Sequence, residues 1–137
     1  MNRMKTLTTA LGAALCLVIA AQTVWASDVR PNKRRGQVYY RMVCTECHVK
    51  ATGKPIAPMD QTMDEWRQYL DADKHDVTGA TNPSARFYMS RAYREEIKDS
   101  NKAAKKFLKL QDDQIYQDVR AFVISGAKDS DTPASCN

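Results

Sequence analysis

Long hydrophobic runs, strand-like patterns and internal repeats are scarce in this sequence of 137 residues. Beyond an N-terminal stretch, no segment approaches the roughly 20 apolar residues that a membrane-spanning helix needs. Runs of β-branched residues are few, and apolar residues do not alternate with polar ones, so a β-sheet is not expected. The apolar patterns that remain have helical spacing. The sequence therefore predicts one small all-α domain.

The sequence also lacks a basic block with interleaved aromatic residues. Its formal net charge is +5, from 21 Lys and Arg against 16 Asp and Glu. Arg3 and Lys5 lie in a segment that we expect to be removed, which leaves 19 basic residues and a charge of +3. A charge this small and this dispersed does not favour nucleic-acid binding. We expect no nucleic-acid partner.

Residues 1–26 have the organisation of a secretory signal peptide. The two basic residues named above precede an apolar run at 7–21, and small or tolerable residues at 24–26 precede the expected cleavage point. A retained membrane anchor is the alternative, but the run is short for a span. We expect a leader at 27–32, export to the periplasm or beyond, and no membrane span in the mature protein.

Three cysteines remain in the mature chain, namely Cys44, Cys47 and Cys136. An odd number in an exported protein leaves at least one cysteine without an intramolecular partner. Cys136 belongs to a polar C-terminal tail at 127–137. A free thiol is the favoured interpretation for it, and an intermolecular disulfide or a second attachment is the alternative.

The strongest motif is Cys44-Thr45-Glu46-Cys47-His48, a Cys-x-x-Cys-His run. Two thiols add to the two vinyl groups of haem, and two intervening residues let one helical turn present both thiols. The histidine that follows binds the iron through its imidazole. A thioredoxin-like site would need a βαβ context, and a zinc site would need two more ligands than the sequence offers nearby. We expect one covalent haem c with His48 as an iron ligand.

Two helices are expected before residue 80, separated by a loop. The first covers 33–46, and a glycine with two prolines predicts a loop at 50–61. Thr62 and Glu65 form a capping box that opens the second helix. Its apolar face holds Met63, Trp66 and Leu70.

Two more helices are expected in the second half of the chain. A polar loop at 71–81 precedes Asn82-Pro83, which favours a third helix that continues to about Ser100. The last helix opens near Asp112 and stops at Gly126. Its apolar stripe holds Ile115, Val119, Phe122 and Val123.

Gly36, Tyr40 and Cys44 follow one another at intervals of four residues on one helix face. With the haem motif, and with Phe122 in the last helix, they resemble class I cytochromes c. The resemblance implies a small cytochrome c-like fold at 33–126, with about four helices around one covalent haem. It also implies that the N- and C-terminal helices cross at Gly36, and that Tyr40 packs on Phe122.

The same resemblance makes a prediction about the residues around the haem. It implies that the carbonyl of Pro55 or Pro58 accepts a hydrogen bond from the ring N–H of His48, which would orient that ring. Trp66 and Tyr69 are candidates for contacts with the haem propionates or the haem pocket.

The sixth iron ligand departs from the family pattern. Class I cytochromes present a methionine shortly before the last helix, but residues 102–109 contain neither methionine nor histidine. His75, the only other histidine, is the leading candidate, although charged neighbours also favour a solvated loop residue. Met89 is the main alternative. Met63, Met59 and an open sixth position also stay possible.

These features predict an electron carrier and not an enzyme. A monomer that meets its redox partners transiently suits the small, weak interfaces of such encounters. Lys102, Lys105, Lys106 and Lys109 either contribute to docking or form a solvated helix face. The alternatives are a gas sensor or peroxidase-like enzyme with an open sixth position, and an electron-delivering subunit of a larger oxidoreductase.

Overall fold

The computed structural model describes residues 30–76 and 82–135, and every regular element in these ranges is helical. The prediction of an all-α class is confirmed for this part of the chain, where no helix is long and apolar enough to cross a membrane. The expected signal peptide and Cys136 lie outside the described residues. The elements in chain order are α1 (Lys33–Tyr39), η1 (Tyr40–Thr45), α2 (Glu46–Thr52), η2 (Pro58–Asp60), α3 (Met63–Ala72), η3 (Phe87–Met89), α4 (Arg91–Ile97), α5 (Lys102–Lys106) and α6 (Asp112–Ser125).

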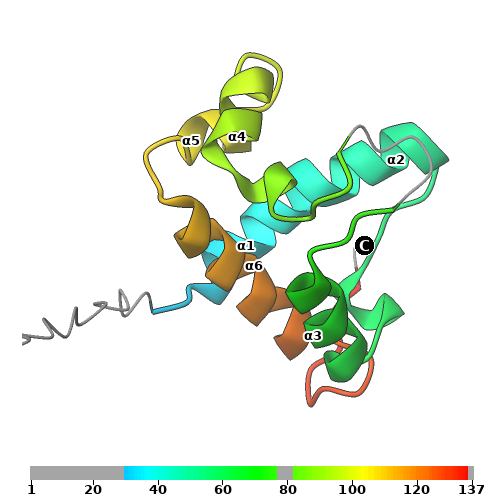
Figure 1. The fold of residues 1–137 in the computed structure, drawn as a ribbon. Coiled ribbons are helices and arrows are strands. Elements are labelled where there is room, and N and C mark those ends of the chain that lie inside the picture. The colour runs from blue at the N-terminus through cyan, green and yellow to red at the C-terminus, as the bar shows by residue number, and fades with distance from the viewer. Residues whose placement is uncertain (1–29, 77–81, 136–137) are drawn as a thin grey trace, which may run out of the picture.

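The first three elements form one continuous helix, with a π-helical turn at η1 between α1 and α2 (Figure 1). The prediction that this helix ends near Glu46 is wrong, because it continues to Thr52. A charged pair one turn apart, Lys50 Nζ to Glu46 Oε1 at 2.8 Å, supports the extension. Gly53 then adopts a left-handed φ of 72° and donates its N–H to the Val49 carbonyl, which stops the helix.

Helix α3 begins as the capping box predicts. The Thr62 hydroxyl accepts from the Glu65 N–H at 3.2 Å, and the Glu65 carboxylate accepts from the Thr62 N–H at 2.7 Å. Trp66 and Leu70 are buried on its apolar face. The helix ends at Asp73, which takes a left-handed φ of 51°.

The prediction of a helix from Asn82-Pro83 is wrong. The Asn82 side-chain oxygen accepts from the Ser84 N–H at 2.9 Å, so this residue forms a local turn and not a helix cap. Helix α4 begins only after Ser90, whose side chain accepts from the Tyr93 N–H at 3.2 Å. A short helix that the sequence did not predict, α5, follows an N-cap at Asn101.

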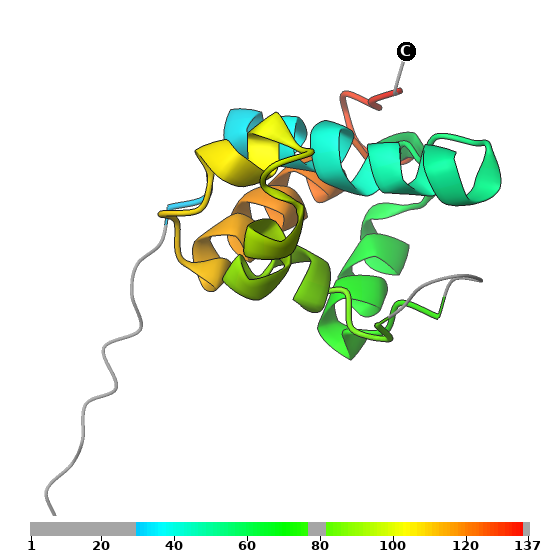
Figure 2. The same ribbon diagram turned by 90° about the horizontal axis from the view of Figure 1, so that it is seen from above.

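Helices α1 and α6 cross at the centre of the fold (Figures 1 and 2). A Cβ on Gly36 would overlap the backbone carbonyl of Asp118, so only glycine fits at the crossing. Tyr40 packs on Phe122 with ring centroids 5.6 Å apart. Both contacts that the resemblance implied between the first and last helices are present.

Asp118 fixes the start of α1 against α6. Its carboxylate is fully buried, accepts from the Asn32 N–H at 2.6 Å and pairs with the Arg35 guanidinium. The Asn32 side chain caps α1 by accepting from the Arg35 N–H. One buried acid on the last helix therefore sets where the first helix begins.

Candidate functional site

The cysteine motif lines a small cavity together with both histidines of the chain. The cavity has a volume of about 40 Å³ and is lined by Val43, Cys44, Cys47, His48, His75, Tyr88 and Tyr93. A second cavity of about 60 Å³ shares Cys44, His48, His75 and Tyr88 with the first. Its other walls are Tyr40, Ile56, Trp66, Tyr69, Leu70, Ala85, Met89, Val119 and Val123. The two cavities thus adjoin, and their lining is mainly apolar and aromatic.

The residues of this site come from both helical and non-helical backbone. Cys44 lies in the π-helical turn, and Cys47 and His48 lie in α2. π-Helical turns occur frequently at functional sites. His75 lies in the non-helical residues 74–76, which follow α3, and its ring contacts the ring of His48 in α2. One part of the lining is therefore α2 with the π-helical turn, and the rest combines His75 with side chains of other helices, such as Tyr69 of α3 and Tyr93 of α4.

The two imidazole rings contact each other edge to face, with centroids 5.6 Å apart and planes at 62°. The Tyr69 hydroxyl lies 2.6 Å from Nδ1 of His75, so this nitrogen has a partner while Nε2 remains for another ligand. Burial lowers the pKa of both histidines, and the neighbouring His48 lowers the pKa of His75 further. Both shifts favour the neutral ring, which is the form in which imidazole binds metals.

His75 is half-buried and is held by its neighbours, unlike a solvated loop histidine. Its N–H donates to the Pro83 carbonyl at 2.6 Å. The Asp73 carboxylate accepts from the Ser84 hydroxyl at 2.8 Å and from the Arg86 N–H at 2.7 Å. These bonds join the two ends of the segment. Sequence reasoning missed the role of Asp73, because nothing in its local pattern indicates partners 11 and 13 residues away.

The two cysteines of the motif differ in exposure. Cys44 is half-buried, and burial together with the nearby Cys47 raises the pKa of its thiol to about 12. Cys47 is exposed, and both are free thiols. Tyr93, which lines the first cavity beside them, has its pKa raised to about 12, chiefly by burial. Burial likewise raises the pKa of Tyr69 well above its ordinary value, so its phenol stays protonated.

Of the methionines proposed as the sixth iron ligand, Met89 lines one of the two cavities, and Met59 and Met63 line neither. Met89 is buried and lines the second cavity. Trp66 and Tyr69 also line this cavity. Met63 instead lines a groove elsewhere on the molecule, and Met59 is 41% exposed. The fold brings His75 and Met89 to the motif and leaves Met59 and Met63 away from both cavities.

The Pro58 carbonyl has a different partner from the one that the resemblance implied. It accepts a hydrogen bond at 2.7 Å from the indole Nε1–H of Trp66, which joins η2 to α3. Within the described residues, no hydrogen bond links the His48 ring to Pro55 or Pro58. The Trp66 indole N–H is therefore used within the fold, and its ring contributes an apolar wall.

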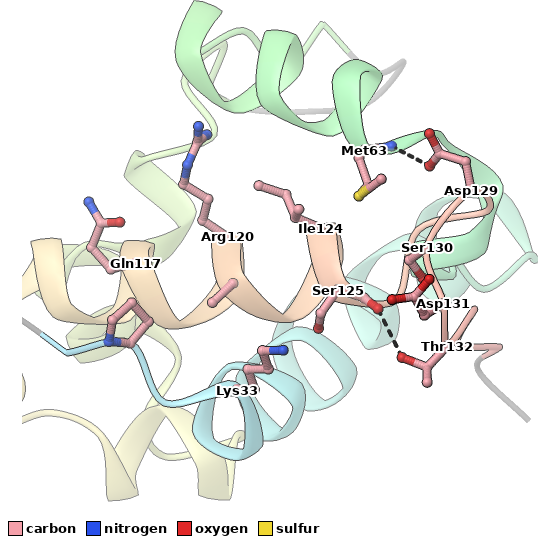
Figure 3. Close-up of a pocket in the computed structure, with 12 residues that line it drawn as sticks. Lys33, Met63, Gln117, Arg120, Ile124, Ser125, Asp129, Ser130, Asp131 and Thr132 are labelled. Carbon is pink, nitrogen blue, oxygen red and sulfur yellow. Dashed lines mark hydrogen bonds between the residues drawn. The ribbon is translucent and has the colours of Figure 1, made fainter.

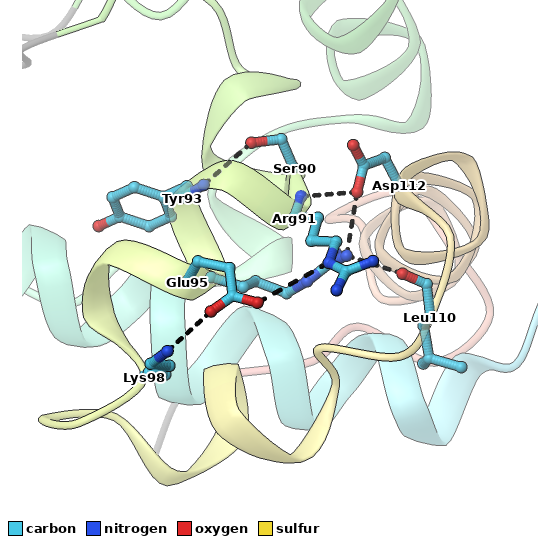
Figure 4. A network of polar contacts seen from close by, with 8 residues as sticks. Ser90, Arg91, Tyr93, Glu95, Lys98, Leu110 and Asp112 are labelled. Atoms are coloured by element: carbon cyan, nitrogen blue, oxygen red, sulfur yellow. Dashed lines mark hydrogen bonds and ion pairs between the residues drawn. The ribbon is translucent and has the colours of Figure 1, made fainter.

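Arg94 is a fully buried cation that sequence reasoning did not identify. Its guanidinium donates to the Met89 carbonyl at 2.7 Å, to the Leu110 carbonyl at 2.8 Å and to Asp112 Oδ1 at 2.9 Å. The Arg91 N–H donates to the same carboxylate oxygen (Figure 4). This network fastens η3, with Met89 at its end, to the beginning of α6.

A separate groove lies away from the motif, between α6, the start of α3 and the C-terminal tail (Figure 3). It has a volume of about 470 Å³ and shares no residue with the two cavities. The Met63 N–H donates to Asp129, and the Thr132 hydroxyl donates to the Ser125 carbonyl at its rim. Its side chains form no set of groups suited to a reaction.

No protein-family model, curated protein or solved structure matches this chain. Across residues 30–76 and 82–135, no group of three or more His, Cys, Asp and Glu side chains is arranged to hold a metal ion alone. The case for a function consequently rests on the cysteine motif, the two histidines and the cavities between them.

Proposed function

We propose that the protein is an exported, periplasmic electron carrier with one haem c joined to Cys44 and Cys47. The convergence of both cysteines and both histidines on one aromatic-lined cavity carries this proposal. When bound, haem supplies a one-electron couple at its iron. His48 follows the second cysteine directly and would bind the iron from the cysteine side.

The residues present suit a large flat apolar group better than a bare metal ion. The cavity walls include Tyr40, Trp66, Leu70 and Val123, which offer apolar contact area. Cavities of about 40 and 60 Å³ are much smaller than a porphyrin, so loading requires the two walls to move apart. Residues 74–76, which carry His75, are not helical, so we expect this part of the lining to move.

We propose His75 as the ligand that faces His48. The two rings already lie in edge-to-face contact with their centroids 5.6 Å apart, and the Nε2 of His75 is the nitrogen that Tyr69 leaves available. Met89 reaches the same cavity and remains the alternative. Methionine in this position would raise the reduction potential relative to a second histidine.

With His75 in this role, the chain acts by holding both imidazoles in place and by keeping water out of an apolar pocket. No bond has to be made or broken by a side chain, which suits electron transfer. A gas sensor or a peroxidase-like enzyme needs an open sixth position, and His75 would have to leave His48 to provide one. Redox partners would dock transiently on a monomer.

The proposal is tested by expressing the full chain in a bacterium that attaches haem c and measuring the intact mass and absorption of the product. We expect loss of residues 1–26 and gain of the mass of one haem. Cys47→Ala should lose one of the two thioether bonds, and Cys44→Ala with Cys47→Ala should lose covalent haem entirely. Cys136→Ser is the matched control and should retain it. Haem-free wild-type protein under these conditions would refute the proposal.

A further inference from the structure

Tyr69 makes the one side-chain hydrogen bond of the His75 ring among the described residues. Its hydroxyl oxygen lies 2.6 Å from Nδ1. Tyr69 projects from the middle of α3, where the capping box and the buried Trp66 and Leu70 hold the helix rigid. The Trp66 ring packs edge-on against Tyr69 at 5.9 Å. The hydroxyl is therefore presented to His75 from a fixed position.

We propose that Tyr69 is a positioning residue for His75, which it orients by accepting a hydrogen bond from Nδ1–H so that the Nε2 lone pair points toward His48. This inference rests on the proposed function, because it concerns the ligand opposite His48. With the proton on Nδ1, a neutral imidazole has its free lone pair on Nε2. The hydrogen bond thus selects both the tautomer and the direction of the ring.

The neighbouring Tyr88 does not perform the same task. Its ring lies 4.8 Å from the His75 ring and contacts it edge to face. Its hydroxyl, however, accepts from the Asn82 N–H at 3.0 Å and donates to the Asn82 carbonyl at 3.2 Å. Tyr88 therefore confines the ring by contact, whereas Tyr69 determines which nitrogen is available.

Removal of the Tyr69 hydroxyl should weaken His75 as a ligand while leaving the fold intact. A hydrogen bond to the second nitrogen of a ligating histidine increases its basicity, and its loss typically costs 10–100-fold in affinity. A less basic imidazole stabilises ferric iron less, so the midpoint potential should rise. Phenylalanine fills the same space as tyrosine, so the packing against Trp66 is kept.

The test compares Tyr69→Phe with Tyr116→Phe in the loaded protein. Tyr116 also bonds to α3, through its hydroxyl to the Leu70 carbonyl at 3.3 Å, but it lines neither cavity. In ferrous protein, carbon monoxide competes with the ligand opposite His48. We expect Tyr69→Phe to bind carbon monoxide about 10–100-fold more tightly than wild type, in line with the cost of losing such a partner, and to show a higher midpoint potential. Tyr116→Phe should match wild type in both.

The outcomes separate this inference from the function on which it rests. Protein that carries covalent haem and shows unchanged carbon monoxide affinity and potential in Tyr69→Phe would overturn the role of Tyr69 alone. Equal effects of Tyr69→Phe and Tyr116→Phe would also overturn it, since they would indicate a general loosening of α3. Absence of covalent haem from the wild-type protein would overturn both proposals. Far-ultraviolet circular dichroism of each variant verifies that α3 is retained.

Discussion

At the scale of single residues, the chemistry available at the site depends on which side-chain atoms already have a hydrogen-bond partner. Trp66 uses its indole N–H on Pro58, and Tyr88 uses its hydroxyl on Asn82. His75 has its Nδ1 engaged by Tyr69 and is drawn toward Pro83 by its backbone. Its Nε2 is the ring nitrogen that this hydrogen bond leaves available to a ligand.

The two candidates for the position opposite His48 can be separated by substitution. We expect His75→Ala to convert the ferric protein from a low-spin to a high-spin absorption spectrum, because it removes one strong-field imidazole. Met89→Leu keeps the volume and apolar character of the side chain and should leave the low-spin spectrum unchanged. The opposite result, with the spectrum altered by Met89→Leu alone, would assign the position to Met89.

At the scale of elements, one continuous helix carries the cysteines, and its alignment depends on the crossing with α6. Gly36 allows the backbones to meet, Tyr40 packs on Phe122, and Asp118 holds the start of the helix. The π-helical turn follows this crossing and contains Cys44. Any change that separates α1 from α6 should therefore also displace the cysteine motif.

Gly36→Ala tests the close approach of the two helices. The added methyl group meets the backbone of Asp118, which cannot rotate away as a side chain could. We expect a loss of about 1–3 kcal/mol or more in the free energy of unfolding, the range for overpacked sites. The control is Gln37→Ala, an exposed position one residue further along the same helix, which should change stability by less than about 0.5 kcal/mol. Urea denaturation measures both, and equal midpoints would contradict the expectation.

At the scale of the whole molecule, the site shares side chains with the hydrophobic core. The buried residues from α1, η1, α3 and α6 belong to one cluster that includes cavity-lining side chains such as Tyr40, Trp66 and Val119. A domain of this size buries a limited apolar area, so a large apolar group in the cavity would contribute a substantial part of the core. Stability and loading are accordingly expected to be linked.

This link predicts that the unloaded protein is less stable. The double variant Cys44→Ala with Cys47→Ala should unfold at a lower temperature than the loaded wild-type protein, because the cavity walls lose the apolar surface that they would otherwise cover. Cys136→Ser, which keeps the motif, should unfold at the wild-type temperature. Thermal denaturation followed by circular dichroism measures all three. Equal melting temperatures for the double variant and the loaded protein would show that the core forms independently of bound haem.

The sequence by itself determined the features that depend on local chemistry. The Cys-x-x-Cys-His spacing, the capping box at Thr62 and Glu65, the apolar stripe of the last helix and its stop at Gly126 are all readable within a few residues. The resemblance of the residues around this motif to class I cytochromes c also implied the contacts of Gly36 and Tyr40 with α6. The prediction of a helix start at Asn82-Pro83 was wrong because the same pair of residues also occurs in turns.

Only the tertiary structure decided which residues face the motif. His75 and Met89 reach the cavities because Asp73 bonds to Ser84 and Arg86 and because Arg94 fastens η3 to α6. Such contacts depend on how segments distant in sequence pack, and no local pattern records them. The local chain therefore specified the cysteine motif, whereas the surroundings of the second histidine were set by the packing of the whole domain.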